Sequence, residues 1–154
     1  SGSTTAELVR YLPDLQDLTV ITNALNITNL LSSNPNINLI IPGGYLRKNS
    51  LSLVGPLAEK NLLNFNVDKV FLGVDGFDTK QGIYTPNMEE ARLNEIMIQI
   101  SREVIVLADS SKFVKRSLAF ICDLSHIDKV ITDSNISPED KKRLIDAGVE
   151  VIIV

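Results

Sequence analysis

Acidic residues follow two apolar runs of this sequence at the point where each run ends. Asp75 comes directly after residues 70–74, and Asp109 comes directly after residues 104–108, with Lys112 three positions further on. Runs rich in Val, Ile, Leu and Phe are typical of strands covered on both faces, and residues just past such strands reach the crevice where open α/β sheets bind ligands. Carboxylates bond to hydroxyl groups, and a lysine attracts an anion. The pattern favours a site for a small polyhydroxylated anion, although acidic residues after strands are also ordinary turn formers.

Glycine and hydroxyl residues near the start of the sequence extend this hypothesis. Gly2, Ser3, Thr4 and Thr5 precede an apolar helical pattern, and the exposed N–H groups at a helix start suit a phosphate. A second interpretation stays open, in which Thr4 only caps the helix through the capping-box spacing with Glu7. Together with the carboxylates and the lysine, this segment fits a phosphorylated sugar better than an apolar ligand.

Further polar and glycine residues are expected beside the same crevice. Thr22 and Asn23 end one predicted strand, and Gly43 and Gly44 end the next, where two glycines permit a tight turn close to a ligand. Glu90 has the spacing of a helix cap, so a capping role and a ligand role both stay open. The predicted ligand-binding residues are Gly2, Ser3, Thr4, Thr5, Thr22, Asn23, Gly43, Gly44, Arg47, Asp75, Gly76, Asp78, Glu90, Asp109 and Lys112.

Composition excludes several classes of site and partner. Fifteen basic against 19 acidic residues give a net charge of −4, which argues against nucleic acid binding by this segment itself. Cys122 is alone, so no intrachain disulfide, cysteine zinc site or redox pair can form, and a reducing, cytoplasmic setting is expected. No apolar run is long enough to span a membrane. No helix with the dinucleotide-binding glycine spacing follows Gly43 and Gly44, so no nucleotide site is predicted. No other cofactor and no metal is predicted either.

The elements that would position these residues alternate between strands and helices. Parallel neighbours need long crossover connections, so the alternation predicts an α/β fold with a doubly wound, mostly parallel sheet and helices on both faces. Residues 45–52 are polar and are predicted to form a loop, whereas residues 79–85 form a loop or hairpin. Predicted strands occupy residues 18–22, 37–41, 70–74, 104–108, 118–124, 129–132 and 149–154. Their polar ends, Asp133 after residues 129–132 included, would share one edge.

Several of these stretches occur together, and in the same order, in a known family. They are residues 1–5 with the following helix, Thr22 with Asn23, and residues 42–46, 53–56, 71–76, 90–91 and 108–113. The most specific is the last, Ala-Asp-Ser-Ser-Lys-Phe. Over nearly its whole length the chain resembles the C-terminal effector-sensing domain of the DeoR family of bacterial transcriptional regulators.

The resemblance implies more than the residue pattern does. Domains of this family look like the ribose-5-phosphate isomerase fold and bind phosphorylated sugars, which change the DNA affinity of a winged helix-turn-helix placed before them. Residues 1–154 would then be one sugar-phosphate effector-sensing domain, with DNA bound only through an upstream segment that this chain lacks. A cytoplasmic homo-oligomer that does not contact membranes is the expected form.

The isomerase similarity also implies residue roles. Its phosphate loop resembles residues 2–5, with Lys112 as a second phosphate contact, and its acidic turn resembles residues 75–78. Its catalytic glutamate matches Glu90, but the lysine and glycine run that should precede it has no counterpart in residues 79–83. Isomerisation needs a base and a group that stabilises the enediolate. The resemblance therefore favours a sensor without catalytic residues, with an aldose-ketose sugar-phosphate isomerase as the alternative.

Overall fold

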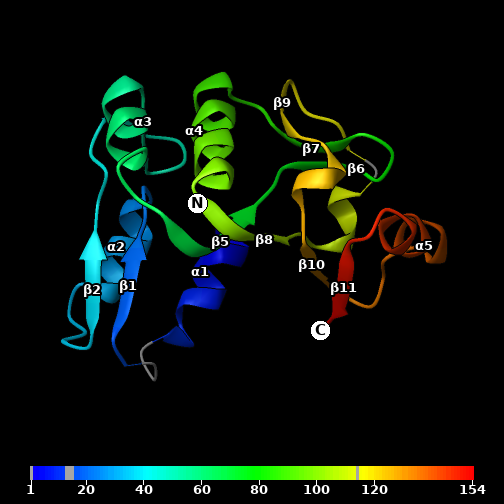
Figure 1. The fold of residues 1–154 in the computed structure, drawn as a ribbon, viewed down its shortest axis with the longest axis horizontal. Helices are drawn as coiled ribbons and strands as arrows, with labels where there is room; N and C mark the ends of the chain where they lie inside the picture. The colour runs from blue at the N-terminus through cyan, green and yellow to red at the C-terminus, as the bar shows by residue number, and fades with distance from the viewer. Residues whose placement is uncertain (1, 13–15, 114) are drawn as a thin grey trace. The chain divides into compact units, whose positions relative to one another are not determined.

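The computed structural model describes residues 2–12, 16–113 and 115–154, with Ser3 by its backbone alone. The sequence also predicts that Pro13 ends the first helix, but Pro13 and any role for the Ser3 side chain lie outside the described residues. The chain divides into two compact units, Ser1–Phe65 and Asn66–Val154, which we call the N-terminal and C-terminal units. Figure 1 shows the path of the chain through both. No helix formed by the described residues has the length and apolar character needed to cross a membrane.

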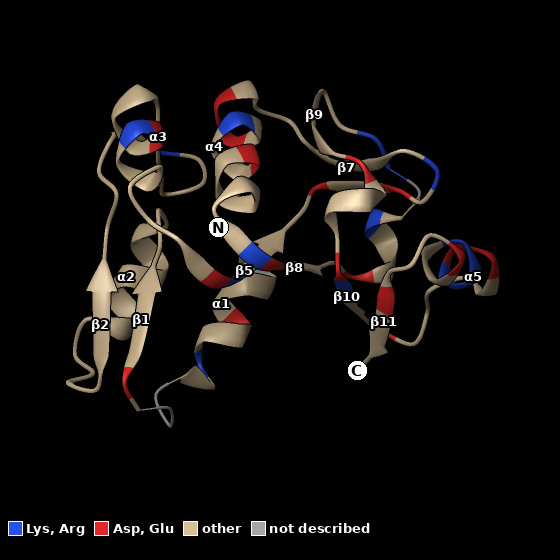
Figure 2. Ribbon diagram, viewed as in Figure 1, with Lys and Arg blue, Asp and Glu red and all other residues tan. Residues whose placement is uncertain are grey.

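The N-terminal unit is built on two parallel strands, β1 (Leu18–Ile21) and β2 (Ile37–Ile40), which pair with Leu18 opposite Ile37. The helix α2 (Leu25–Leu31) connects them, as parallel pairing requires. The helix α1 (Ser3–Val9) contacts α2. Its core consists of Val9, Ala24, Ile27, Leu31 and Ile37. Figure 2 shows that β1, α2 and β2 carry no charged residue.

The predicted loop at residues 45–52 is wrong. Those residues belong to an antiparallel hairpin of β3 (Tyr45–Arg47) and β4 (Ser52–Val54), followed by α3 (Pro56–Leu62). The hairpin is fixed by contacts distant in sequence, because Ser52 bridges Ala24 and is fully buried. A polar segment with short strands gives little local indication of such pairing.

The C-terminal unit contains a four-stranded parallel sheet in the order β11-β10-β8-β5 and a three-stranded antiparallel sheet in the order β6-β7-β9. The largest fully buried side chains in this unit are Phe77, Ile83, Leu93, Leu144, Val106 and Val130. The elements of the unit are β5 (Val67–Gly73), β6 (Gly76–Asp78), β7 (Gly82–Thr85), α4 (Met88–Gln99), β8 (Ser101–Leu107), the 3-10 turn η2 (Ser110–Lys112), β9 (Ala119–Cys122), η3 (Leu124–His126), β10 (Lys129–Thr132), α5 (Pro138–Asp146) and β11 (Glu150–Ile153).

The α/β class with parallel strands and crossover helices is confirmed. Among the described residues the strands form four sheets, two of them antiparallel, where the sequence pattern indicates one continuous sheet. The helix termini agree with several local signals. Asn87 caps α4 by accepting from the amides of Glu89 and Glu90, and Ser137 caps α5 ahead of Pro138.

The predicted Thr4–Glu7 capping box is wrong. Thr4 lies inside α1, and Gly2 occupies the N-cap position with no side-chain cap. Gly2 has a φ of 118°, a backbone conformation that favours glycine, and the helix begins at Ser3, directly after it and before Thr4.

Candidate functional site

Three carboxylates follow neighbouring strands of the parallel sheet at equivalent positions. Gly73 of β5 pairs with Leu107 of β8, and Leu107 pairs with Ile131 of β10. Two residues beyond each paired position the side chains are Asp75, Asp109 and Asp133. The structure therefore brings the acidic ends of β5, β8 and β10 to one edge of this sheet, as the sequence predicts for this unit.

Asp75 and Glu90 share a single hydroxyl group. The Oγ1 of Thr85 lies 3.2 Å from Oδ2 of Asp75 and 3.2 Å from Oε2 of Glu90. Thr85 is buried, whereas Asp75 is exposed and Glu90 half-buried. A threonine hydroxyl carries one hydrogen, so it donates to one carboxylate at a time. This hydroxyl therefore cannot donate to both carboxylates together.

Hairpin pairing explains this contact. Gly76 opposes Tyr84 and Asp78 opposes Gly82 in the β6–β7 register, and the amide of Asp75 bonds to the carbonyl of Tyr84. One step further along the same register, Thr85 stands opposite Asp75. Sequence reasoning missed Thr85, although the symmetry of the hairpin about its turn was the signal that could have found it.

The loop that carries Lys112 is held by two other carboxylates. Asp109 caps η2 by accepting from the Ser111 amide at 3.0 Å and from the Ser111 hydroxyl. Asp133 accepts from the Ser110 amide at 2.6 Å. Lys112 is half-buried at the end of this turn. The acidic residues thus fix the backbone of the segment from which Lys112 projects.

The electrostatics of these two carboxylates follow from the same contacts. Hydrogen bonds from the Ser110 and Asn135 amides lower the pKa of Asp133 to about 2. Hydrogen bonding by Ser111 lowers the pKa of Asp109, while partial burial and the charge of Asp133 oppose that shift. Both groups are ionised at neutral pH.

Asp78 is engaged in structural contacts. Its Oδ2 accepts from Nε of Arg116 at 2.6 Å and pairs with Nη2 at 2.5 Å, and its Oδ1 accepts from the Lys80 amide at 2.8 Å. Burial opposes the charged form, but these hydrogen bonds outweigh it and leave the pKa of Asp78 below its usual value. Gly76 lies under the same segment, since a Cβ there would be 2.6 Å from the carbonyl oxygen of Lys115.

The predicted residues of the N-terminal unit gather around the β3–β4 hairpin. Asn23 donates from Nδ2 to the Leu53 carbonyl at 3.0 Å and its own carbonyl accepts from the Leu53 amide. The Thr22 hydroxyl accepts from the Ala24 amide at 3.2 Å. Both side chains are buried, so they hold the end of β1 against the hairpin.

The other predicted ligand residues of this unit also have structural roles or contacts within it. Gly43 and Gly44 have φ values of 79° and 111°, and a Cβ on Gly44 would be 2.5 Å from the Val54 carbonyl oxygen. Arg47 donates to the Ser50 hydroxyl at 3.2 Å. Thr5 is buried within α1. Gly44 is therefore needed for close backbone packing, and Gly43 for its positive φ, whatever ligand binds.

The structure thus groups Asp75, Gly76, Asp78, Glu90, Asp109 and Lys112 in the C-terminal unit, and the other predicted residues in the N-terminal unit. The expected meeting of the two groups at one crevice stays a prediction. Among the described residues, no three His, Cys, Asp or Glu side chains come together as a metal site requires.

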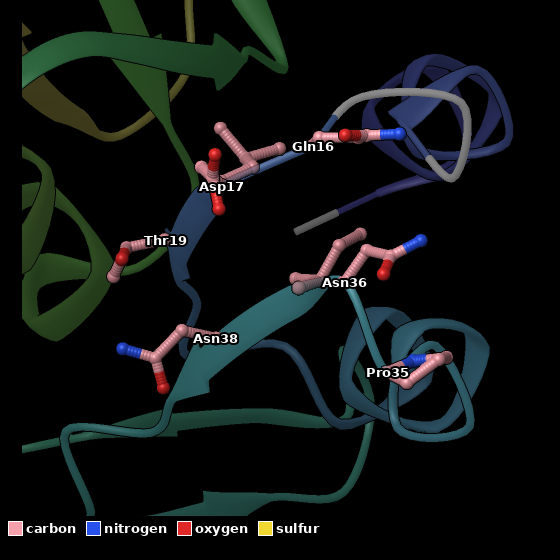
Figure 3. Close-up of a pocket in the computed structure, with 8 residues that line it drawn as sticks. Gln16, Asp17, Thr19, Pro35, Asn36 and Asn38 are labelled. Carbon is pink, nitrogen blue, oxygen red and sulfur yellow. The ribbon is translucent and has the colours of Figure 1, made fainter.

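A hollow of about 520 Å³ lies elsewhere in the N-terminal unit (Figure 3). It is lined by the starts of β1 and β2, with Asp17 as its charged residue among those described. Because β1 and β2 are parallel, this is the end of the sheet opposite to Thr22 and Asn23. No predicted ligand residue lines it.

Comparison with known proteins decides the family. The model of the DeoR C terminal sensor domain matches residues 1–134. The chain belongs to the DeoR sensor-domain family. The DeoR sensor-domain match ends within the C-terminal unit, just beyond Asp133, and so includes every predicted ligand-binding residue.

Relatives of this DeoR sensor domain are regulators of transcription. A putative aga operon transcriptional repressor from Escherichia coli O157:H7 is 42% identical over all of the chain and 57% of its own length. The uncharacterised HTH-type regulator YulB of Bacillus subtilis is 42% identical over 99% of the chain and 59% of its length, and the HTH-type regulator GlpR of Haloferax volcanii is 34% identical over the same shares. The chain therefore spans less than two thirds of these relatives, whose names point to regulation and not to catalysis.

Proposed function

We propose that this DeoR sensor domain binds a phosphorylated sugar and that the ligand controls DNA binding by the repressor to which the domain belongs. One observation carries the proposal. Asp75 and Glu90 compete for the single Thr85 hydroxyl at the edge of the parallel sheet where Asp109 and Lys112 also lie. Such carboxylates can accept hydrogen bonds from sugar hydroxyls, and the ammonium group of Lys112 can bind the phosphate.

Each candidate side chain has a role consistent with its contacts. Asp75 and Glu90 would accept from the sugar, because both carboxylates lie within hydrogen-bond distance of the same Thr85 hydroxyl, whereas Asp78 is held by Arg116. Asp109 and Asp133 would keep Lys112 in place. In the N-terminal unit the backbone at residues 2–5 stays the predicted phosphate loop, on the strength of the family motif.

The rest of the regulator follows from the comparisons. In the whole protein a helix-turn-helix segment outside residues 1–154 would contact the operator, which agrees with the HTH-type names of the relatives and with the net charge of −4. The protein would act in the cytoplasm as a homo-oligomer. Ligand binding would shift the population of conformations or subunit arrangements that bind DNA.

Calorimetry and thermal-shift measurements with phosphorylated sugars, the matching unphosphorylated sugars and inorganic phosphate test the proposal. Stabilisation by at least one sugar phosphate, and not by its unphosphorylated counterpart, is expected. Lys112→Ala should weaken that binding by about 2–5 kcal/mol, because it leaves a desolvated phosphate without its cation. Lys141→Ala, which removes an exposed lysine of α5, is the matched control.

The outcome that contradicts the proposal is equally direct. Absence of stabilisation by every sugar phosphate at millimolar concentration would remove the ligand class. Equal affinity in the Lys112→Ala and Lys141→Ala proteins would remove Lys112 from the site. Turnover of the bound sugar phosphate, abolished by Glu90→Gln, would replace the sensor by the isomerase alternative.

A further inference from the structure

The strand β6 lies at one end of the β6-β7-β9 sheet, and the chain that follows the turn η2 packs against it. A Cβ on Gly76 would be 2.6 Å from the carbonyl oxygen of Lys115 and 3.2 Å from the amide nitrogen of Ser117. Only glycine lets two backbones approach this closely. We call residues 113 and 115–117 the edge segment. Its backbone therefore lies directly on the first residue of β6.

The next two residues of β6 hold the edge segment through their side chains. Phe77 is fully buried and stacks on Phe113, with ring centroids 4.8 Å apart and planes 20° apart. The carboxylate of Asp78 contacts Arg116 at two points, Nε at 2.6 Å and Nη2 at 2.5 Å. Because the Asp78 side chain is only 14% exposed and the contact is two-pronged, this ion pair is stronger than an open surface pair. Three consecutive residues of β6 thus each contact the edge segment.

Two candidate ligand residues adjoin this contact, one on each side of it. Asp75 directly precedes β6, and Lys112 directly precedes the edge segment. The amide of Lys115 donates to the carbonyl of Lys112 at 3.2 Å, so a backbone hydrogen bond ties the edge segment to the turn η2. Contacts that fix the edge segment on β6 therefore restrict the movement of Lys112 relative to Asp75.

We propose that Arg116 is a positioning residue of the ligand site: by binding Asp78, it holds the turn that carries Lys112 in a fixed place beside Asp75. This inference rests on the proposed function, in which Asp75 binds the sugar and Lys112 binds the phosphate. Arg116 acts without contacting the ligand, because its guanidinium group is occupied by Asp78. A site whose anion-binding group is already in place loses less conformational entropy when it binds.

Arg116→Met tests this role, since it removes every donor of the guanidinium group and keeps a long side chain. Calorimetry with ribose 5-phosphate, glucose 6-phosphate and fructose 6-phosphate identifies the tightest ligand of the parent protein. The dissociation constant for that ligand should rise about three- to tenfold, the cost of ordering one mobile side chain on binding. Arg102→Met is the matched control, because Arg102 is exposed, belongs to the same unit and pairs with Asp68 at 3.6 Å. It should leave the affinity unchanged.

A double variant distinguishes positioning from a general loss of stability. In a Lys112→Ala background, Arg116→Met should have no further effect on affinity, because the group that Arg116 positions is absent. A general loosening of the unit would instead weaken binding by the same factor in both backgrounds. An unchanged affinity in Arg116→Met, or an equal loss with and without Lys112, would overturn the positioning role.

Hydrogen exchange separates this inference from the ligand proposal, because it needs no ligand. The amides of Ser111, Lys112 and Lys115 donate within the turn and the edge segment, and they should exchange faster in Arg116→Met but not in Arg102→Met. Unchanged exchange would overturn the inference whatever the protein binds. Faster exchange in a protein that binds none of the three sugar phosphates would overturn the proposed function, and with it the ligand role of Arg116, while the contact that holds the turn stands.

Discussion

Two buried threonines of the C-terminal unit should respond in opposite ways to the same chemical change. Thr85 is 3% exposed and donates to the carboxylates of Asp75 or Glu90, whereas Thr132 is 2% exposed and its hydroxyl has no hydrogen-bond partner among the described residues. Valine has nearly the shape of threonine and replaces the hydroxyl by a methyl group. Thr85→Val therefore removes a hydrogen bond, and Thr132→Val removes an unpaired polar group.

The contacts set the expected magnitudes. Hydrogen bonds to charged groups contribute about 1.5–3 kcal/mol to stability. The Thr85 hydroxyl has only one hydrogen, and both of its distances, 3.2 Å, are long for an O–H donor. Thr85→Val should therefore lower the free energy of unfolding by about 1–1.5 kcal/mol. Thr132→Val should raise the free energy of unfolding by up to about 1 kcal/mol, because burying an unpaired hydroxyl is unfavourable and valine suits a strand.

Urea unfolding at neutral pH measures both changes. The difference between the two variants, about 2 kcal/mol, isolates the hydrogen bond, since the change in side-chain packing is the same type at both sites. If Thr85→Val is no more destabilising than Thr132→Val, the Thr85 hydroxyl does not bridge the two carboxylates, and the geometry argued for the candidate site is wrong.

Three further predictions concern the same unit. Gly82→Ala should lower the free energy of unfolding by about 2–4 kcal/mol in a urea titration, because φ is 140° and a Cβ would overlap the Cys122 carbonyl oxygen. Burial raises the pKa of the Cys122 thiol to about 12, so a thiol reagent at neutral pH should modify it at the rate of unfolding, and rapid reaction would contradict this. The pKa of Asp133 is about 2 in the folded protein, against an ordinary value of 3.8. Its ionised form therefore stabilises the fold above about pH 4, and this contribution is lost as the pH falls to about 2. The difference in unfolding free energy between the parent protein and Asp133→Asn should shrink between about pH 4 and about pH 2.

The edge of the parallel sheet could be predicted because its signals are local. The apolar runs before Asp75 and Asp109 indicate buried strands, and alternation with helices indicates parallel pairing. Once those strands pair in register, their polar ends necessarily meet. The α4 cap at Asn87 was equally visible as a spacing in the sequence.

Features that depend on contacts between segments distant in sequence could not be predicted from local sequence patterns. The β3–β4 hairpin exists because Asn23 and Ala24 hold Leu53 and Ser52, and neither partner marks the other in the sequence. The sequence pattern predicts Asp78 as a ligand residue, but in the structure its carboxylate accepts a hydrogen bond from Arg116, 38 positions later. The capping signal at Thr4 was overridden by the backbone freedom of Gly2.

The placement of Asp75, Asp109 and Asp133 just beyond three paired strands has a consequence for how such sensors can diversify. Neighbouring strands of a sheet lie about 4.8 Å apart, so the hydrogen-bond ladder, and not the connecting segments, sets the spacing of Gly73, Leu107 and Ile131, the paired residues two positions before these carboxylates. Insertions or replacements in the crossover helices would leave that spacing intact. New ligand specificities could therefore arise from changes in the surrounding loops, while the strands keep the distances between the carboxylates that follow them.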